Sequence, residues 1–104
     1  MNITDVINDT ILNEFIERMH LDEAESENLR RILFASHEDL IAKCGNYDIH
    51  NEVAFKELVF ERSRYVYNDA LEYFDTNFLS QINHLGIKKA LEGIVLDGDT
   101  DATI

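Results

Sequence analysis

Four histidines and one cysteine are the residues of this sequence that could bind a metal ion or act as a nucleophile. They are His20, His37, His50, His84 and Cys44. No two of them have the spacing of a metal-binding pair, and the His-Glu-x-x-His pattern of zinc enzymes is absent. Isolated histidines usually serve as solvated or capping residues, and Cys44 lies on an apolar stripe where a thiol acts as a small buried hydrophobe. The sequence therefore predicts neither a metal site nor a catalytic thiol.

Three aspartates, Asp97, Asp99 and Asp101, imitate the first three ligands of a calcium-binding loop. Ala102 stands where that loop requires glycine, and no bidentate glutamate follows. The sequence also lacks a glycine-rich phosphate loop and a serine-nucleophile motif. We therefore expect no calcium binding, no cofactor and no enzymatic activity.

Acidic residues dominate the charge of the chain. Its 21 Asp and Glu residues against 9 Lys and Arg residues give a formal net charge of -12. Such a charge repels nucleic acids and anionic membranes. Asn2, Thr4 and Asp5 interrupt any apolar run at the start, so we expect no signal peptide, and no stretch approaches the roughly 20 apolar residues of a membrane span. These features favour a single intracellular domain that binds other proteins.

Apolar residues recur at helical spacing through most of the 104 residues, among which there is no proline. The pattern predicts an all-α bundle with three main helices, near residues 4–20, 23–44 and 51–75, and two short helical pieces or one kinked helix at 77–94. The break in this last segment is expected at Gly86. We expect one helical domain at 1–95 and a flexible acidic tail at 96–104. The residues expected in the core are Leu33, Leu40, Leu58 and Tyr65.

The predicted helix 51–75 carries apolar side chains on more than one face. Such a helix either lies at the centre of a bundle or also contacts another subunit. Its charged residues are either a solvated face, with Glu61 and Arg64 paired three residues apart, or charges that set the register between subunits. The candidate subunit or partner interface comprises Phe60, Glu61, Arg62, Arg64, Tyr67 and Phe74.

Three stretches of the sequence resemble a known family. They are residues 11–18, residues 29–45, and residues 57–74 continued by 77–80. The third stretch is the most specific, because it contains the distinctive string Arg-x-Arg-Tyr-x-Tyr-Asn-x-Ala at 62–70. Over roughly residues 4–92 the sequence is similar to the small head–tail connector proteins of tailed phages and prophages of Gram-positive bacteria. These are also called head-completion or DNA-packaging proteins.

This resemblance implies an all-helical protein that docks as a ring beneath the portal protein of the phage head. A dodecameric portal could template a dodecamer, and we expect a monomer with weak self-association when the protein is free. Such a ring extends the DNA channel, completes the head and offers a platform to the next neck or tail-completion protein. DNA passes through without specific binding, and an acidic wall suits this role because it repels phosphate within a screening length of ~10 Å. The implied location is the head–tail junction of the virion, after assembly in the bacterial host cytoplasm. The segment expected to reach the portal includes Ile87, Leu91, Ile94 and Leu96.

Two other classes of function remain open from the sequence. One is an acidic helical regulator that binds a host protein, including a DNA mimic that blocks a DNA-binding enzyme. The other is an enzyme whose site matches no motif. A connector forms rings or docks on a portal, whereas a DNA mimic binds a basic protein one to one. The state of assembly therefore discriminates between the first two classes.

Overall fold

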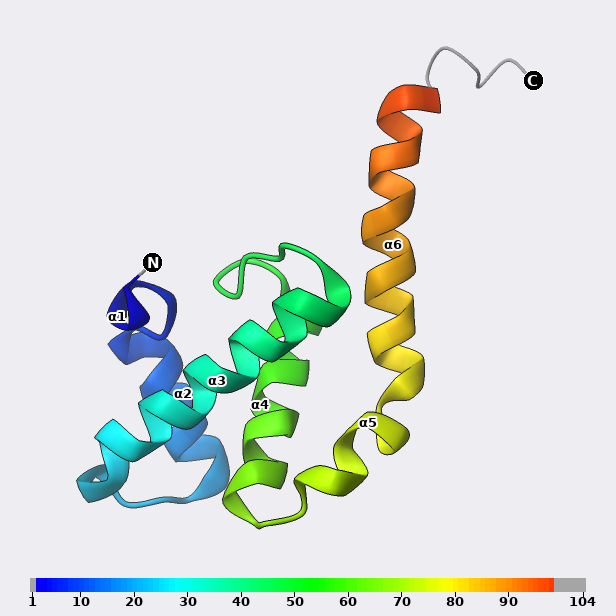
Figure 1. The fold of residues 1–104 in the computed structure, drawn as a ribbon. Helices are drawn as coiled ribbons and strands as arrows, with labels where there is room; N and C mark the ends of the chain where they lie inside the picture. The colour runs from blue at the N-terminus through cyan, green and yellow to red at the C-terminus, as the bar shows by residue number, and fades with distance from the viewer. Residues whose placement is uncertain (1, 99–104) are drawn as a thin grey trace.

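The computed structural model describes residues 2–98 of the chain. These residues form six α-helices and two short 3-10 helices, joined by turns and loops (Figure 1). Side chains are described for residues 2–93. The elements are α1 (Ile3–Val6), α2 (Asp9–Met19), η1 (Glu23–Glu25), α3 (Ser26–Cys44), α4 (Val53–Tyr67), η2 (Leu71–Tyr73), α5 (Phe74–Asn77) and α6 (Leu79–Gly98). No strand occurs within residues 2–98, so the predicted all-α class is confirmed.

The first predicted helix, 4–20, is divided into α1 and α2 at Ile7 and Asn8. Asn8 has an extended backbone, and its side-chain oxygen accepts a hydrogen bond of 3.0 Å from the backbone N–H of Ile11. This N-cap satisfies a donor that the first turn of α2 leaves free. Ile7 is fully buried between the two helices. The break between α1 and α2 therefore directs the Ile7 side chain into the core. A straight helix would place this side chain differently.

The second predicted helix, 23–44, is nearly correct. The turn η1 precedes α3, and α3 ends at Cys44 with Gly45 following at φ 102°. This left-handed backbone favours glycine. A side chain at Gly45 would also meet Lys89, because a Cβ there would lie 2.6 Å from the Lys89 Cγ. Glycine thus both ends α3 and permits the close approach of α6.

The third predicted helix, 51–75, is too long, because α4 ends at Tyr67 after 15 residues. Asp69 adopts a left-handed conformation at φ 57°, and the N–H of Ala70 donates to the carbonyl of Tyr65 at 2.8 Å. This is a Schellman termination, which usually has glycine at the left-handed position. At 1.5 Å per residue α4 spans ~22 Å instead of the predicted ~37 Å. The chain then reverses direction through η2 and α5.

The last helix, α6, is continuous over 20 residues rather than kinked or split. Gly86 lies within it, where a Cβ would meet only the Lys43 carbonyl at 3.5 Å, an ordinary contact. The expected break at Gly86 is therefore wrong, and the predicted tail at 96–104 begins too early, since α6 continues to Gly98. The rest of that predicted tail, 99–104, lies outside the described residues.

The core forms where α2, α3, α4 and the first half of α6 meet. Leu33, Leu40 and Leu58 are buried as predicted, whereas Tyr65 is half-buried at the edge of the core. The largest fully buried side chains are Phe15, Phe55, Phe60 and Phe74. Burial of such aromatic side chains is the main favourable contribution to folding.

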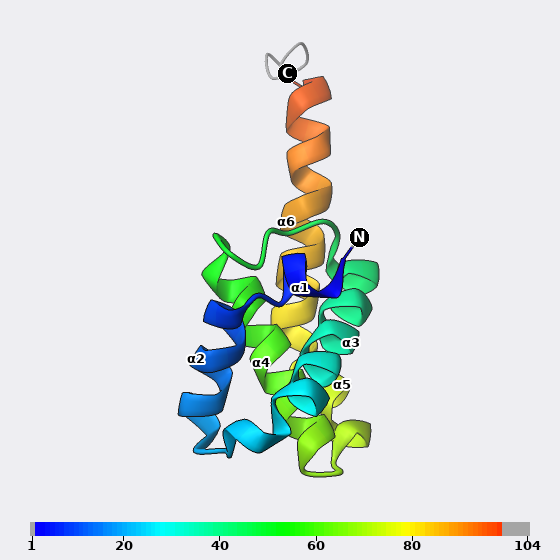
Figure 2. The same ribbon diagram turned by 90° about the vertical axis from the view of Figure 1, so that its left-hand side faces the viewer.

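Helix α3 crosses α4 and its C-terminal end reaches α6, while α2 lies on the side of α4 away from α6 (Figure 1). Both views show α6 rising beyond all the other helices (Figure 2), and the longest dimension of the molecule is 57 Å against 29 and 20 Å for the other two. Within the described residues, no helix combines the length and the apolar character needed to cross a membrane. The fold is thus a small body, residues 2–78, with one projecting helix.

Candidate interaction surface

The two phenylalanines of the predicted interface lie inside the body. Phe60 is 1% exposed and its ring centroid lies 5.3 Å from that of Phe15. Phe74 is fully buried, and its ring stacks on Phe78 with centroids 5.1 Å apart. These two apolar side chains, which lie on additional faces of the predicted helix 51–75, are therefore buried within the chain itself. This corrects the expectation that a monomer leaves these two side chains exposed to water.

Tyr67, the third aromatic residue of that set, is half-buried and serves a contact within the chain. Its hydroxyl donates to the carboxylate of Glu25, with O–O distances of 3.0 and 3.1 Å. This hydrogen bond raises the pKa of Tyr67, because the carboxylate stabilises the protonated phenol. The bond joins the end of α4 to η1, so Tyr67 holds two elements of the body together.

Arg62 belongs to a polar cluster between α3 and α4. Its Nε lies 3.1 Å from an Asp39 carboxylate oxygen, and its guanidinium donates to the Ser36 hydroxyl at 3.1 Å. The Ser63 hydroxyl donates to Ser36 at 3.0 Å. Lys43 reaches the same oxygen of Asp39 at 2.8 Å. With a side chain only 15% exposed, Arg62 connects α3 and α4 within one chain, and its role between subunits stays a prediction.

Glu61 and Arg64 form a local pair on the surface of α4. The Arg64 guanidinium lies 2.6 Å from the Glu61 carboxylate, and this hydrogen bond raises the pKa of Arg64. The guanidinium also stands 5.1 Å from the centroid of the Tyr65 ring. The predicted pairing is present, and Arg64 remains 44% exposed. A role of these two residues between subunits stays a prediction.

The C-terminal segment, by contrast, presents two of its apolar residues, Ile87 and Leu91, to solvent. Ile87 is 59% exposed and Leu91 is 51% exposed. The other two residues predicted for this segment, Ile94 and Leu96, lie in α6, but their side chains are outside the described part of the structure. Exposed aliphatic side chains on a helix that leaves the body are typical of a contact with another chain.

Among residues 79–93, the contacts of α6 with the body end at Lys89. Ile82 and Leu85 are buried, and the Tyr47 hydroxyl donates to the carbonyl of Leu85 at 2.8 Å. The last such contact is Lys89, whose ammonium lies 4.3 Å from the centroid of the Tyr47 ring. Residues 90–93 are all exposed. Residues 90–93 of α6 thus extend into solvent beyond the core.

Helix α6 also differs from the rest of the chain in charge. Between residues 79 and 93 two lysines, Lys88 and Lys89, stand against one acid, Glu92. Residues 1–78 hold 17 of the 21 acidic residues and 7 of the 9 basic ones, so they carry -10 of the net charge of -12. Asp97 also belongs to α6, so this helix is neutral overall and differs from the acidic body in that respect.

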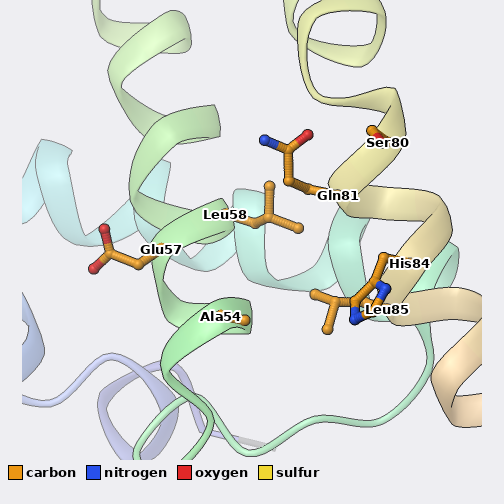
Figure 3. A pocket seen from close by; sticks show the side chains of 7 residues that line it. All are labelled: Ala54, Glu57, Leu58, Ser80, Gln81, His84 and Leu85. Carbon is orange, nitrogen blue, oxygen red and sulfur yellow. The ribbon is translucent and has the colours of Figure 1, made fainter.

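A groove of about 430 Å³ runs between α4 and the first half of α6 (Figure 3). Its residues are Ala54, Glu57, Leu58, Ser80, Gln81, His84 and Leu85. Leu58 and Leu85, each 4% exposed, form its apolar floor, and Glu57 on its edge pairs with Arg18 at 2.7 Å. Nothing in the sequence pattern indicated this groove, because it depends on how α4 and α6 are placed side by side.

The histidines and the cysteine are dispersed. Among the described residues, no three His, Cys, Asp or Glu side chains come close enough to hold a metal ion. His37 is buried and its Nδ1 lies 2.7 Å from the Glu38 carboxylate. Cys44 is 2% exposed, and burial raises the pKa of its thiol. These residues have structural positions, so the exposed surfaces of α6 and its groove are the candidate site.

No protein-family model, curated protein sequence or solved structure matches the chain at a significant level.

Proposed function

We propose that the protein is a structural head–tail connector of a tailed phage or prophage, which docks on the portal protein, extends the DNA channel and completes the head for tail attachment. One observation carries the proposal: the C-terminal helix α6 leaves the body with Ile87 and Leu91 exposed. The resemblance described above expects this segment to reach the portal. A body with its own closed core and a projecting apolar helix suits an adaptor between two larger assemblies.

The charge of the molecule supports the same role. A connector must surround DNA without binding it, and the acidic body, with its share of the net charge of -12, disfavours contact with phosphate. The basic pairs, Arg30-Arg31 and Lys88-Lys89, are isolated. Arg30 is moreover engaged within the chain, by an ion pair with Asp9 and a hydrogen bond to the Ile7 carbonyl. A basic stripe of the kind that tracks a nucleic-acid backbone is not formed by these residues.

The test is to mix the purified protein with the portal protein of the same phage and examine the mixture by cryo-electron microscopy. The full chain should decorate one end of the portal as a ring. A variant truncated after Lys89 should remain folded, because the removed residues whose side chains the structure describes, 90–93, are exposed, and it should fail to decorate the portal. The matched control is Tyr73→Ala, which removes an exposed aromatic side chain (61% exposed) far from the projecting end.

Two results would overturn the proposal. One is a portal that stays bare in the presence of the full chain. The other is one-to-one binding of the protein to a basic host DNA-binding protein, which would favour the regulator or DNA mimic instead.

A further inference from the structure

We propose that the cavity between α1, α3 and the loop 45–52 binds the guanidinium group of an arginine residue from another protein. The cavity has a volume of about 810 Å³, which is within the range of pockets that hold ligands. It lies where the loop after α3 passes α1 (Figure 2). No residue of α6 lines it, so this site is separate from the helix that the proposed function assigns to the portal and does not depend on that function.

A firmly held loop forms one wall of the cavity. Tyr47 and Ile49 are buried, at 6% and 2% exposed, whereas the loop residues that alternate with them are exposed. The Asp48 carboxylate accepts a hydrogen bond of 2.9 Å from the backbone N–H of His50, and His50 Nε2 donates to the Asp5 carbonyl at 3.3 Å. The loop is thus fixed to the core and to α1 before any ligand arrives, which lowers the ordering cost of binding.

Three carboxylates line the cavity, and no lysine or arginine of the described residues does. The carboxylates belong to Asp5, Glu38 and Asp48. Their only ion-pair contact among the described residues is that of Glu38 with the His37 ring, at 2.7 Å. Hydrogen bonding, chiefly from the backbone N–H of His50, lowers the pKa of Asp48, so this carboxylate stays charged. The cavity therefore carries negative charge that no lysine or arginine of the described chain neutralises.

His37 supplies the observation that indicates a hydrogen-bond donor as the ligand. Its side chain is only 6% exposed, and its ring packs against Phe34 and Phe55. Because an ionised carboxylate can only accept, His37 Nδ1 donates to Glu38, and Nε2 of the neutral ring is then an acceptor. Within the described residues Nε2 has no hydrogen-bond partner and is not enclosed. It therefore opens onto the cavity that His37 lines.

A guanidinium group matches this set of acceptors better than an ammonium group or a metal ion. It carries five N–H donors in one plane and no acceptor. It is also more weakly hydrated than an ammonium group, which suits a cavity that the buried side chains of Val6 and Ile49 also line. Among the described residues, no three side chains of the metal-binding types come close enough to hold a metal ion.

The arginine is expected to come from a different protein rather than from a second copy of this chain. All five arginines of the sequence form ion pairs with acidic residues of their own chain, and these are Arg18, Arg30, Arg31, Arg62 and Arg64. The half-buried Ile41 also lines the cavity and offers an apolar contact to a residue beside the bound arginine. A protein segment with apolar residues next to an arginine therefore fits better than free arginine.

The experiment titrates the full chain with capped tripeptides that have leucine on both sides of arginine, lysine or citrulline. Citrulline keeps the shape of arginine without its charge. Binding is followed by two-dimensional ¹H–¹⁵N NMR at about 50 mM salt, where charges are weakly screened. The arginine peptide should shift the signals of residues 46–50 and of His37 Nε2 in a saturable way. The citrulline peptide should bind at least about tenfold more weakly and the lysine peptide at least about threefold more weakly.

A double variant tests whether the cavity is the binding site. Asp5→Asn with Glu38→Gln removes two charges and keeps the size of both side chains, and the new amide can still accept from His37 Nδ1. The matched control, Glu17→Gln with Glu72→Gln, removes the same charge from two exposed residues that do not line the cavity. The cavity variant should bind the arginine peptide at least about tenfold more weakly, and the control within about twofold of the wild type.

Capped free arginine distinguishes a protein partner from a small molecule. It should bind at least about tenfold more weakly than the arginine peptide, because it lacks the apolar neighbours. Equal affinity would overturn the assignment to a protein, and equal affinity of the lysine peptide would overturn the assignment to a guanidinium group. The site itself is refuted if the arginine peptide gives no saturable shift below about 10 mM, if citrulline binds as well as arginine, or if the cavity variant binds like the control.

Discussion

Helices α4 and α6 carry apolar side chains on more than one face, yet they use them differently. In α4 these apolar side chains are buried inside the molecule. Phe55 and Phe60 point to different neighbours, and both are at most 1% exposed. In α6 only the first half is covered, and Ile87 and Leu91 remain exposed. Apolar side chains on several faces of a helix are therefore buried where other elements pack on both of its sides, and stay exposed where the helix extends beyond its neighbours.

The largest expected effect is a loss of core packing in the body. Phe60→Ala should lower the free energy of unfolding by about 3–5 kcal/mol, because it leaves a cavity in a close-packed core. Phe60 also contacts Phe15 and lies under the Arg18 guanidinium, 4.9 Å from the ring centroid. Denaturant unfolding followed by circular dichroism measures the change. Phe60→Leu, the matched control, should cost clearly less, and equal stability of Phe60→Ala and the wild type would refute the central role of α4.

Two arginines of one helix sharpen the comparison between buried and surface contacts. Arg62→Ala should cost about 1–3 kcal/mol, because it removes a charged hydrogen-bond partner from the half-buried cluster around Asp39 and Ser36. Arg64→Ala should cost less than about 1 kcal/mol, since the Glu61–Arg64 pair is exposed to solvent. Both are measured by chemical unfolding. The reverse order would mean that the cluster between α3 and α4 adds no stability.

Part of this architecture could be predicted from the sequence, and part could not. Helical periodicity was sufficient to predict the class, the extent of α3 and the burial of Leu33 and Leu40. It could not predict that α4 ends at Tyr67, because the left-handed terminator is Asp69 rather than glycine. A helix continued to residue 75 places Phe74 outside the main apolar stripe of that helix, whereas Phe74 in fact begins α5 and is buried. The groove required the packing of α4 against α6, which no local pattern encodes.

The rate at which the Cys44 thiol is labelled shows whether α6 detaches from the body without global unfolding. Its sulfur lies 3.8 Å from the Ile82 carbonyl, and burial raises the pKa of the thiol, so labelling by a disulfide reagent at pH 8 should be slow. Leu85→Ala removes a buried contact worth about 2–5 kcal/mol and should accelerate labelling at least about tenfold. Leu91→Ala, in the exposed half of the helix, should label at the wild-type rate. Equal rates for Leu85→Ala and the wild type would show that α6 adds no protection.

Tyr47 gives the contact between the body and α6 a dependence on pH. Burial raises the pKa of Tyr47 above its ordinary value of about 10, so the folded state favours the neutral phenol. The stabilising effect is complete below the pKa of the unfolded chain and is lost as pH rises from about 10 through the folded pKa. The difference in the free energy of unfolding between the wild type and Tyr47→Phe, measured by urea unfolding, should therefore become smaller above pH 10. A constant difference from pH 8 to 11 would contradict this prediction.

The smallest expected effect is on the stability of the isolated chain when the exposed face of α6 is trimmed. Ile87→Ala with Leu91→Ala should change the free energy of unfolding by less than about 0.5 kcal/mol in dilute solution, because neither side chain is buried and alanine has the higher helix propensity. Ile82→Ala, on the opposite face and 8% exposed, should cost about 2–5 kcal/mol. Raising the protein concentration separates folding from assembly, since association stabilises only the chain that can associate. The wild-type melting temperature should then rise while that of the Ile87/Leu91 variant stays constant, and a cost above about 1 kcal/mol in dilute solution would instead place these residues within the monomer's own packing.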